Sequence, residues 1–405
     1  MASKKELPKD GRERAKPVRV AVLGTGWIAE RVYLPCLLNH GGIAVVAAHD
    51  PSPEILARFA QSAGLGPGSL GLPACFDPEI DALLLCTPPD AHAQQIAKSI
   101  SLDKYVLCEK PVFRDISELD ALGPVDAVEK YLMGSASMRL RKDVQLLLRW
   151  ITEGVLGPLE HVRLGWWRER GVPAAGSWRT DPQQSPMGVM EDLGPHLLDL
   201  LAALISCHVW KELRVTTSDL RCVYGHDPRR SASWFKGEPD SSYVVPDQAW
   251  ASFLSDTGTN VEVEVCWAHH LPGDYCSLEF RGQKGTAVLR GLLGLSTLRR
   301  SLEQSCCLKI DGQPEVTHTF SGGPEIQMHA FSDSVDIFNG FTRNTRCPAA
   351  NYFEIRRVTE WLTDIQDAAG TGTRPAPATT VSATLAIERE MRDEFLEDDP
   401  SVVYR

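Results

Sequence analysis

The chain has 405 residues, of which 43% are hydrophobic and 23% are charged, and its formal net charge is −11. This length and composition are typical of a globular protein with room for two domains. The acidic balance excludes a general nucleic-acid-binding surface, which needs a basic footprint. The run nearest to a membrane span, residues 193–205, is short and contains His196 and Asp199, so we expect no membrane partner.

Residues 1–17 carry six Lys or Arg and three acidic residues without an apolar core, which predicts a disordered N-terminal tail and not a signal peptide.

The chain has 11 cysteines and no C-x-x-C spacing. Such cysteines indicate reduced thiols and not a zinc site or a disulfide framework. We therefore expect no bound metal and a cytoplasmic location.

Residues 18–23 form an apolar, β-branched run that leads directly into a glycine turn and a helix over 27–38. Gly24, Gly26 and Ala29 fill the G-x-G-x-x-A spacing. In this pattern the first glycine permits a tight turn, the second lets a pyrophosphate approach the backbone, and the small third residue lets the helix pack on the strand. The stretch predicts a dinucleotide cradle, although a strand, turn and helix that bind nothing can show the same isolated pattern.

A second buried strand, residues 42–50, ends in Asp50, which lies 21 positions after Ala29. A dinucleotide fold places a carboxylate at about this distance to bind the ribose hydroxyls of the adenosine. Because a carboxylate repels a 2′-phosphate, Asp50 favours NAD over NADP. The alternative is an ordinary Asp-Pro turn, since Pro51 follows.

The rest of the first half alternates between helices and strands, as a parallel α/β sheet requires. We expect helices over 53–63, 93–100 and 117–130, and strands over 80–86, 105–108 and 131–138. Lys110 follows one of these strands, and the carboxyl end of a parallel strand is the ligand side of such a sheet. A surface lysine beside the turn proline Pro111 is the alternative.

The second half has the pattern of several strands with a few helices. Val261, Val263 and Val265 alternate with polar residues, which indicates a strand with one buried face. Residues 371–405 are expected to form a linker and a final helix. The other expected elements are helices over 142–153, 328–341 and 352–369, a strand over 159–168, and a hairpin of 276–281 with 286–290.

A further helix is expected to begin within residues 192–194, because Pro195 is best tolerated near a helix start. Asp192 and His196 are four residues apart, so their side chains share a face, and Asp199 can reach the same face. Two interpretations fit this spacing. The residues are either reacting groups of an active site, or a helix cap at Asp192 followed by a structural core histidine.

Five stretches occur in one order along the chain, and the last two are the most specific. They are Gly24-Thr-Gly-Trp-Ile-Ala29, Asp50, Thr87-Pro-Pro-Asp-Ala-His92, Cys108-Glu-Lys-Pro111 and Glu191-Asp-Leu-Gly-Pro-His-Leu-Leu-Asp199. With them the chain resembles the Gfo/Idh/MocA family of nicotinamide-dependent oxidoreductases from residue 18 to about residue 370. The resemblance implies an α/β fold with an N-terminal Rossmann dinucleotide-binding domain over 18–139. It also implies a C-terminal α+β domain over 140–370 with an open, mainly antiparallel sheet.

The resemblance also implies the residues of the site. Lys110 would bind the reacting oxygen, His196 would exchange the proton because its ordinary pKa lies near neutral pH, and Asp192 would orient both as the third catalytic residue. The implied cofactor contacts lie in the glycine loop and at the strand ends: Gly24, Gly26, Trp27, Ile28, Asp50, Thr87, Pro88, His92, Glu109 and Lys110. The implied substrate contacts are Arg139, Trp178, Arg179, Asp192 and His196.

The expected reaction is a hydride transfer between NAD(H) and a secondary hydroxyl or ketone of a sugar, a cyclitol or a nucleotide-activated sugar. The resemblance implies a homo-oligomer joined through the C-terminal sheet. Two other functions occur on this fold. One is a non-catalytic NAD-sensing regulator or scaffold, against which the joint presence of Lys110, Asp192 and His196 argues. The other is a glycosidase that uses bound NAD for a transient oxidation.

The chain departs from the family pattern at three places. The segment between Pro111 and residue 131 is short, and the usual glycine-rich run before the aspartate is Ser185-Pro-Met-Gly188 here. Residues 221–247 form a long polar stretch that is either a substrate cover or a plain surface insertion.

Overall fold

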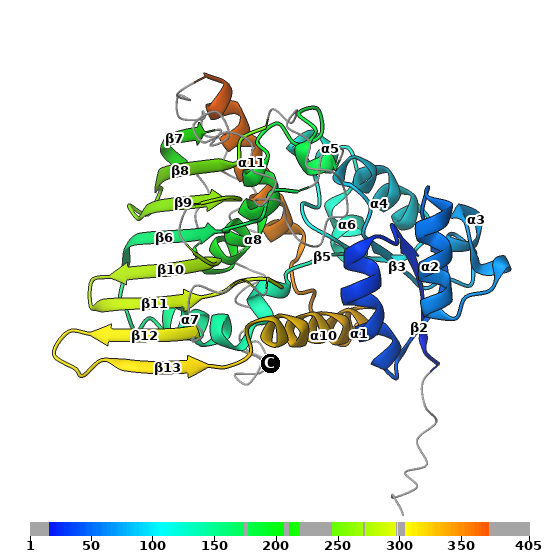
Figure 1. The fold of residues 1–405 in the computed structure, drawn as a ribbon, viewed down its shortest axis with the longest axis horizontal. Helices are drawn as coiled ribbons and strands as arrows, with labels where there is room; N and C mark the ends of the chain where they lie inside the picture. The colour runs from blue at the N-terminus through cyan, green and yellow to red at the C-terminus, as the bar shows by residue number, and fades with distance from the viewer. Residues whose placement is uncertain are drawn as a thin grey trace, which may run out of the picture.

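The computed structural model describes residues 16–173, 177–205, 210–218, 245–269, 272–296, 298 and 304–371. Nearly all of the predicted N-terminal tail, residues 221–244 of the polar stretch, and the predicted C-terminal linker and helix lie outside these residues. Figure 1 shows two sheets at opposite ends of the described chain, with helices between them.

The N-terminal half forms a five-stranded parallel sheet with the order β2-β1-β3-β4-β5. Its strands are β1 (Val18–Leu23), β2 (Ile43–His49), β3 (Ala82–Leu85), β4 (Tyr105–Cys108) and β5 (Leu132–Gly134). Five of the six residues of β1 are buried, because helices cover both faces of a parallel sheet and leave little room for polar side chains. The predicted Rossmann domain is confirmed.

The helices of this domain follow local sequence signals closely. Helix α2 (Pro53–Ala63) has the predicted bounds, since Pro53 occupies its first turn and Gly64 ends it in the left-handed conformation with φ 70°. The single helix expected over 117–130 was wrong, because the chain breaks at Gly123 and Pro124. The remaining helices of the domain are η1 (Ala29–Tyr33), α1 (Leu34–Asn39), η2 (Pro67–Ser69), α3 (Leu72–Cys75), η3 (Pro89–Ala91), α4 (His92–Ser101), α5 (Ile116–Asp120) and α6 (Val125–Tyr131).

The C-terminal half forms an eight-stranded sheet with the order β13-β12-β11-β10-β6-β9-β8-β7. Only the β6–β9 pair is parallel, and every other neighbouring pair is antiparallel. The predicted hairpin is confirmed as β10 with β11. The strands are β6 (Leu159–Trp167), β7 (Trp210–Ser218), β8 (Gln248–Ser255), β9 (Asn260–Cys266), β10 (Tyr275–Gly282), β11 (Gly285–Gly291), β12 (Gln304–Ile310) and β13 (Val316–Phe320).

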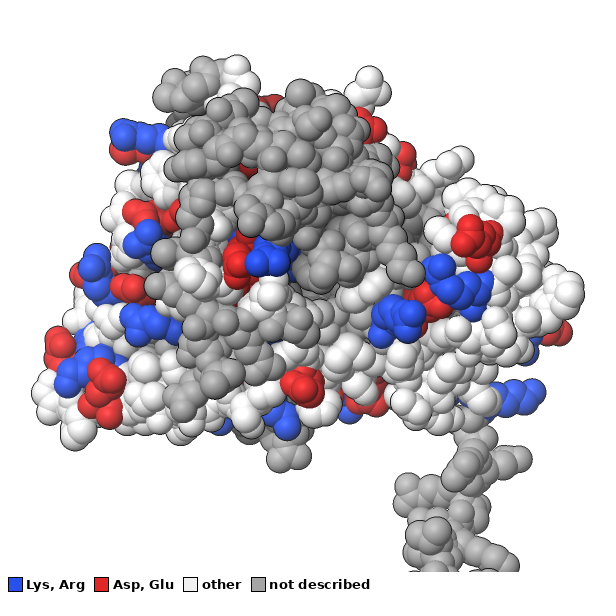
Figure 2. All heavy atoms as spheres, in the orientation of Figure 1, with Lys and Arg blue, Asp and Glu red and all other residues white. Residues whose placement is uncertain are grey.

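Helices cover one face of the large sheet. Helices α7 (Lys142–Thr152), α8 (Val189–Leu204) and α11 (Tyr352–Thr371) pack against its strands (Figure 1). The eight residues of β8 alternate between partly exposed and buried, so the strand presents one face to these helices and leaves the other open. On the view in Figure 2, basic and acidic side chains are interspersed over the described surface.

Helix α10 (Gly323–Phe341) joins the two halves. It begins five residues before the predicted start, because Gly322 precedes it in a left-handed conformation and Pro324 fits its first turn. Its residues Phe331, Val335 and Phe338 belong to the same buried apolar cluster as Val32 and Leu37 of the Rossmann domain. The core of the first domain is therefore completed by a helix that follows the large sheet in sequence.

Between residues 16 and 371, no helix in the described ranges is long and apolar enough to cross a membrane.

Candidate active site

The glycine loop lies where β1 passes into the first helix. Gly24 has φ 79°, and a Cβ added to it would lie 2.5 Å from the carbonyl carbon of Cys86 and from the Thr87 nitrogen. Only glycine therefore lets the end of β3 cross the loop so closely. The loop is also tied to β2, because the Thr25 N–H donates to Asp50 Oδ2 at 2.8 Å.

The loop has the features that a dinucleotide needs. The buried Thr25 hydroxyl makes no hydrogen bond to the described residues, and a Cβ added to Gly26 would meet nothing within 4 Å. The second Asp50 oxygen accepts the Ser52 N–H at 2.9 Å, so the carboxylate is held at the carboxyl end of β2, where a ribose is bound in this fold. These residues would hold a nicotinamide dinucleotide, and Gly26 would let its pyrophosphate approach the backbone.

Glu109 and His92 brace the segments that follow β3 and β4. Glu109 Oε1 accepts hydrogen bonds from the Tyr33 hydroxyl at 2.7 Å and from Ser135 at 2.8 Å. His92 is fully buried, with Nδ1 3.0 Å from the Pro111 carbonyl oxygen and Nε2 2.9 Å from that of Thr87. His92 therefore lies between the two segments, beneath the surface that carries the other predicted cofactor contacts.

Helix α8 begins at Val189, so the predicted start within 192–194 was wrong. Pro195 lies inside the helix, where it removes one backbone hydrogen bond. The extra first turn is supported by Glu191, whose Oε2 accepts the Ser185 hydroxyl at 2.6 Å and the Met187 N–H at 3.0 Å. These hydrogen bonds tie the first turn to the segment before it, and the Val189 N–H donates to the Pro246 carbonyl at 3.1 Å.

Helix α8 brings Asp192 to Lys110, 82 positions earlier in the chain. Lys110 Nζ donates to the Asp192 backbone oxygen at 2.6 Å and lies 3.2 Å from Oδ1. Arg179 Nε donates to the same Oδ1 at 2.8 Å, and the Trp267 indole N–H donates to Oδ2 at 3.0 Å. One carboxylate is thus the centre of a cluster to which four separate chain segments contribute.

The charges of the cluster set the protonation of each group. Burial raises the pKa of Asp192, but Lys110, Arg179 and Arg168 more than offset it and hold the pKa well below its usual range. Burial, together with the Lys110 cation, lowers the pKa of His196 well below its ordinary value. Burial also lowers the pKa of Lys110, while Asp192 acts in the opposite direction. At neutral pH the site therefore holds an ionised Asp192 and a neutral His196, which can accept a proton.

Comparison with known proteins agrees with this geometry. Residues 18–130 match the model of the Gfo/Idh/MocA oxidoreductase family with its NAD-binding Rossmann fold, and residues 144–288 match the C-terminal domain of the same family. The chain belongs to this family. It is an NAD(P)-dependent oxidoreductase that acts on CH–OH groups.

The relatives and a solved structure give the context of this oxidoreductase. A putative UDP-kanosamine synthase oxidoreductase subunit of Amycolatopsis mediterranei is 32% identical over 283 residues, which are 70% of this chain and 77% of that protein. The D-glucoside 3-dehydrogenase of Escherichia coli is 26% identical over 68% of this chain and 78% of its own. The structure of levoglucosan dehydrogenase with NADH and L-sorbose has a TM-score of 0.70 at 18% identity, and it covers 89% of this chain and 100% of its own.

The structure separates Arg139 from the other predicted substrate contacts of the oxidoreductase. Arg139 is 1% exposed, and it donates from Nε and Nη2 to the two Asp199 oxygens at 2.8 and 2.6 Å and from Nη1 to Glu354 at 2.7 Å. These partners place Arg139 in a buried cluster between α8 and α11. Trp178, by contrast, lies beside the active cluster, with the Arg179 guanidinium 4.5 Å from the centre of its ring.

Two residues of the cluster, Trp267 and Arg168, were missed from the sequence. Trp267 directly follows β9 and Arg168 directly follows β6, and these two strands are parallel neighbours. Both residues continue the alternation of buried positions on their strands. This alternation was the sequence feature from which their burial could have been predicted. It indicates a buried face but not what the face contacts.

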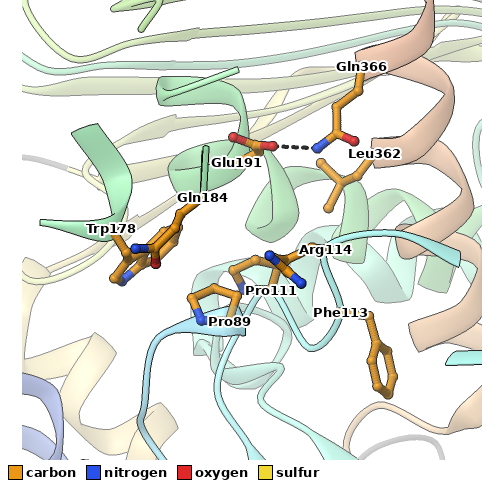
Figure 3. A pocket seen from close by; sticks show the side chains of 9 residues that line it. All are labelled: Pro89, Pro111, Phe113, Arg114, Trp178, Gln184, Glu191, Leu362 and Gln366. Atoms are coloured by element: carbon orange, nitrogen blue, oxygen red, sulfur yellow. Dashed lines mark hydrogen bonds between the residues drawn. The ribbon is translucent and has the colours of Figure 1, made fainter. Parts of the chain in front are cut away.

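A small hollow adjoins the cluster. Figure 3 shows Trp178 and Gln184 on one side of it, the helix α11 residues Leu362 and Gln366 on another, and the Glu191 carboxylate bonded to the Gln366 amide. Three lining residues are the sequence neighbours of Lys110, Arg179 and Asp192. The complete lining is Pro89, Pro111, Phe113, Arg114, Trp178, Gln184, Glu191, Leu362 and Gln366.

Proposed function

We propose that this oxidoreductase transfers a hydride between NAD(H) and a secondary hydroxyl or ketone of a sugar, with a glucoside or a nucleotide-activated sugar as substrate and C3 as the reacting carbon. The observation that supports the proposal best is the cluster of Lys110, Asp192 and His196 beside the carboxyl edge of the Rossmann sheet. The glucoside 3-dehydrogenase among the relatives supports the choice of C3.

The geometry of Lys110 supports its role at the reacting oxygen. An ammonium group has three N–H donors, and two of them are directed to the backbone oxygen and Oδ1 of Asp192. The third donor is available for a substrate oxygen. Asp192, which also accepts from Arg179 and Trp267, keeps the Lys110 side chain at this point.

The neutral state of His196 at pH 7 supports its role as the base. A neutral imidazole can take the proton of a substrate hydroxyl while Lys110 stabilises the negative charge that develops on the oxygen. When bound, the nicotinamide supplies the hydride chemistry. In the reductive direction the same imidazole, once protonated, returns the proton to the oxygen.

The position of Asp50 supports NAD as the preferred cofactor over NADP. Its carboxylate is fixed by the N–H groups of Thr25 and Ser52, and it would lie against the ribose hydroxyls. The 2′-phosphate of NADP would be repelled there by the Asp50 carboxylate. Among the residues that the structure describes, no Lys or Arg is paired with Asp50 to offset this repulsion.

Two further expectations belong to this proposal. The open face of the large sheet would join subunits into a homo-oligomer, which analytical ultracentrifugation would detect as a mass above that of one chain. The free cysteines of the described residues are in keeping with a reducing, cytoplasmic location.

The test is a substrate panel with a matched variant. We expect reduced cofactor to form with NAD and methyl glucoside or UDP-glucose, and NMR of the product to place the ketone at C3. His196→Ala should lower kcat by roughly 10² to 10⁴-fold, the usual contribution of a positioned base, with NAD affinity nearly unchanged.

Other outcomes would favour the other functions of this fold. NAD binding without turnover of any sugar would favour a sensor. Cleavage of the glycosidic bond without added NAD would favour a glycosidase. If His196→Ala unfolds the protein, His196 is a structural core residue and the proposed base must be found elsewhere.

A further inference from the structure

We propose that Arg168 is a positioning residue that acts on His196 through the indole of Trp166, a role that rests on the proposed function of His196 as the base. The period of two along β6 places Val162, Leu164 and Trp166 on the face that α8 covers, and Arg168 continues that face past the end of the strand. The side chain of Arg168 thus projects from the strand toward the helix that carries His196.

The three side chains form a contiguous stack. The Arg168 guanidinium carbon lies 5.5 Å from the centre of the Trp166 ring, within the range of a cation–π contact. The Trp166 ring centre lies in turn 5.6 Å from that of His196, at an interplanar angle of 52°. Trp166 is only 2% exposed, so its orientation is set by packing in the core and not by solvent.

Arg168 is itself held from several directions. Its backbone N–H donates to the Cys266 carbonyl at 2.9 Å, and its own carbonyl accepts the His269 N–H at 2.8 Å. Asp274, which is buried, lies 3.9 Å from Nε. A Cβ added to Gly171 would fall 2.4 Å from the Arg168 Cδ atom, so the backbone at Gly171 packs directly on the arginine stem. This packing fixes the place of the guanidinium.

The charge of Arg168 acts on His196 in a defined direction. The charged groups that face His196 are Lys110, Arg168 and Arg179, which lower its pKa, and Asp192, which raises it. Burial is the largest cause of the lowered pKa. Removing the Arg168 cation should therefore raise the pKa of His196, and the acid limb of the activity profile should move to higher pH with it.

The experiment compares Arg168→Gln and Arg168→Lys with the native protein. Arg163→Gln is the matched control, because Arg163 lies on the same strand with its side chain 54% exposed and pairs only with surface glutamates in the described contacts. The first readout is the pH profile of kcat/KM with the best substrate. The second, which needs no turnover, is an NMR titration of the His196 ring in the cofactor-free protein.

In Arg168→Gln we expect both the acid limb of kcat/KM and the His196 titration to move to higher pH. Arg168→Lys keeps the charge but loses the planar stack, so it should leave the titration near its native position and lower kcat several-fold. Arg163→Gln should change neither.

Unchanged pH profiles and titrations in Arg168→Gln would overturn the proposal, and so would a rise in KM alone, which would make Arg168 a direct substrate contact. If Arg168→Gln does not fold, native kcat in Arg168→Lys would overturn it. A native protein that turns over no sugar would refute the proposed function, but the NMR titration would still decide whether Arg168 acts on His196.

Discussion

Replacing Lys110 by arginine and by methionine gives the sharpest test of the active cluster. Lys110 Nζ reaches the Asp192 backbone oxygen at 2.6 Å and Oδ1 at 3.2 Å, in a site where its side chain is only 14% exposed. A guanidinium is larger and planar, and it cannot direct donors to both of these oxygens and to a substrate oxygen from the same point. We therefore expect Lys110→Arg to be nearly as inactive as Lys110→Met, although it keeps the charge.

The expected loss follows from the donors counted above. One N–H of Lys110 is left for the reacting oxygen, and losing one such donor lowers kcat by roughly 10² to 10³-fold, or about 3–4 kcal/mol. Asp192 keeps its bonds from Arg179 and Trp267 in both variants, so the cluster should survive. The fold should survive with it, because burial already disfavours the Lys110 cation.

The assay is kcat/KM for both variants with the best substrate, together with thermal melting and NAD titration as controls. Near-native turnover by Lys110→Arg would show that Lys110 supplies only a positive potential. The mechanism would then rest on His196 and Asp192. A large drop in melting temperature would instead mean that the lost activity reports damage to the fold.

Four other changes test the cofactor loop and the buried arginine. Asp50→Ser with Ser52→Arg should shift the ratio of kcat/KM values from NAD toward NADP, because repulsion is removed and a phosphate partner is added, and an unchanged ratio would refute the assignment of Asp50. Gly24→Ala should lower the free energy of unfolding by more than about 2 kcal/mol, since φ is positive and the new methyl group meets backbone at 2.5 Å. Gly26→Ala should have the melting temperature of the native protein, because the added carbon has open space around it. In calorimetry it should bind NAD more weakly, and equal affinity would show that no phosphate approaches the backbone there. Arg139→Met should lower the free energy of unfolding in urea by about 3 kcal/mol, because the partly buried carboxylates of Asp199 and Glu354 lose this partner. A loss of substrate affinity without loss of stability would favour the predicted substrate contact.

Elements with strong local signals could be predicted from the sequence. Helix α2 has a proline at its start and Gly64 at its end, and β4 is an apolar run closed by Glu109, so both have the predicted bounds. Helix α8 was misplaced because the support for its first turn comes from Glu191, whose partners lie in the preceding turn and on α11. Side-chain contacts of this kind are not encoded in the spacing of apolar residues.

The active cluster likewise contains residues that could be predicted from the sequence and residues that could not. The motifs around Lys110 and Asp192, together with the Trp178-Arg179 pair, pointed to Lys110, Asp192, His196 and Arg179, because such residues are recognisable within short stretches. Trp267 and Arg168 join it through the register of β6 on β9, in which Trp167 pairs with Cys266. Register is set by the pairing of whole strands, so a single sequence does not give it.

The position of α10 has a consequence for how the protein is made. Its side chains Phe331 and Phe338 belong to the core of the nucleotide-binding domain, yet they are translated roughly 200 residues after Arg139. At bacterial or eukaryotic elongation rates of about 5–20 residues per second, the ribosome needs on the order of 10–40 s to cover that distance. During this interval the part of the Val32 and Leu37 surface that α10 covers is exposed, so the first half emerges as an incomplete domain that a chaperone can bind.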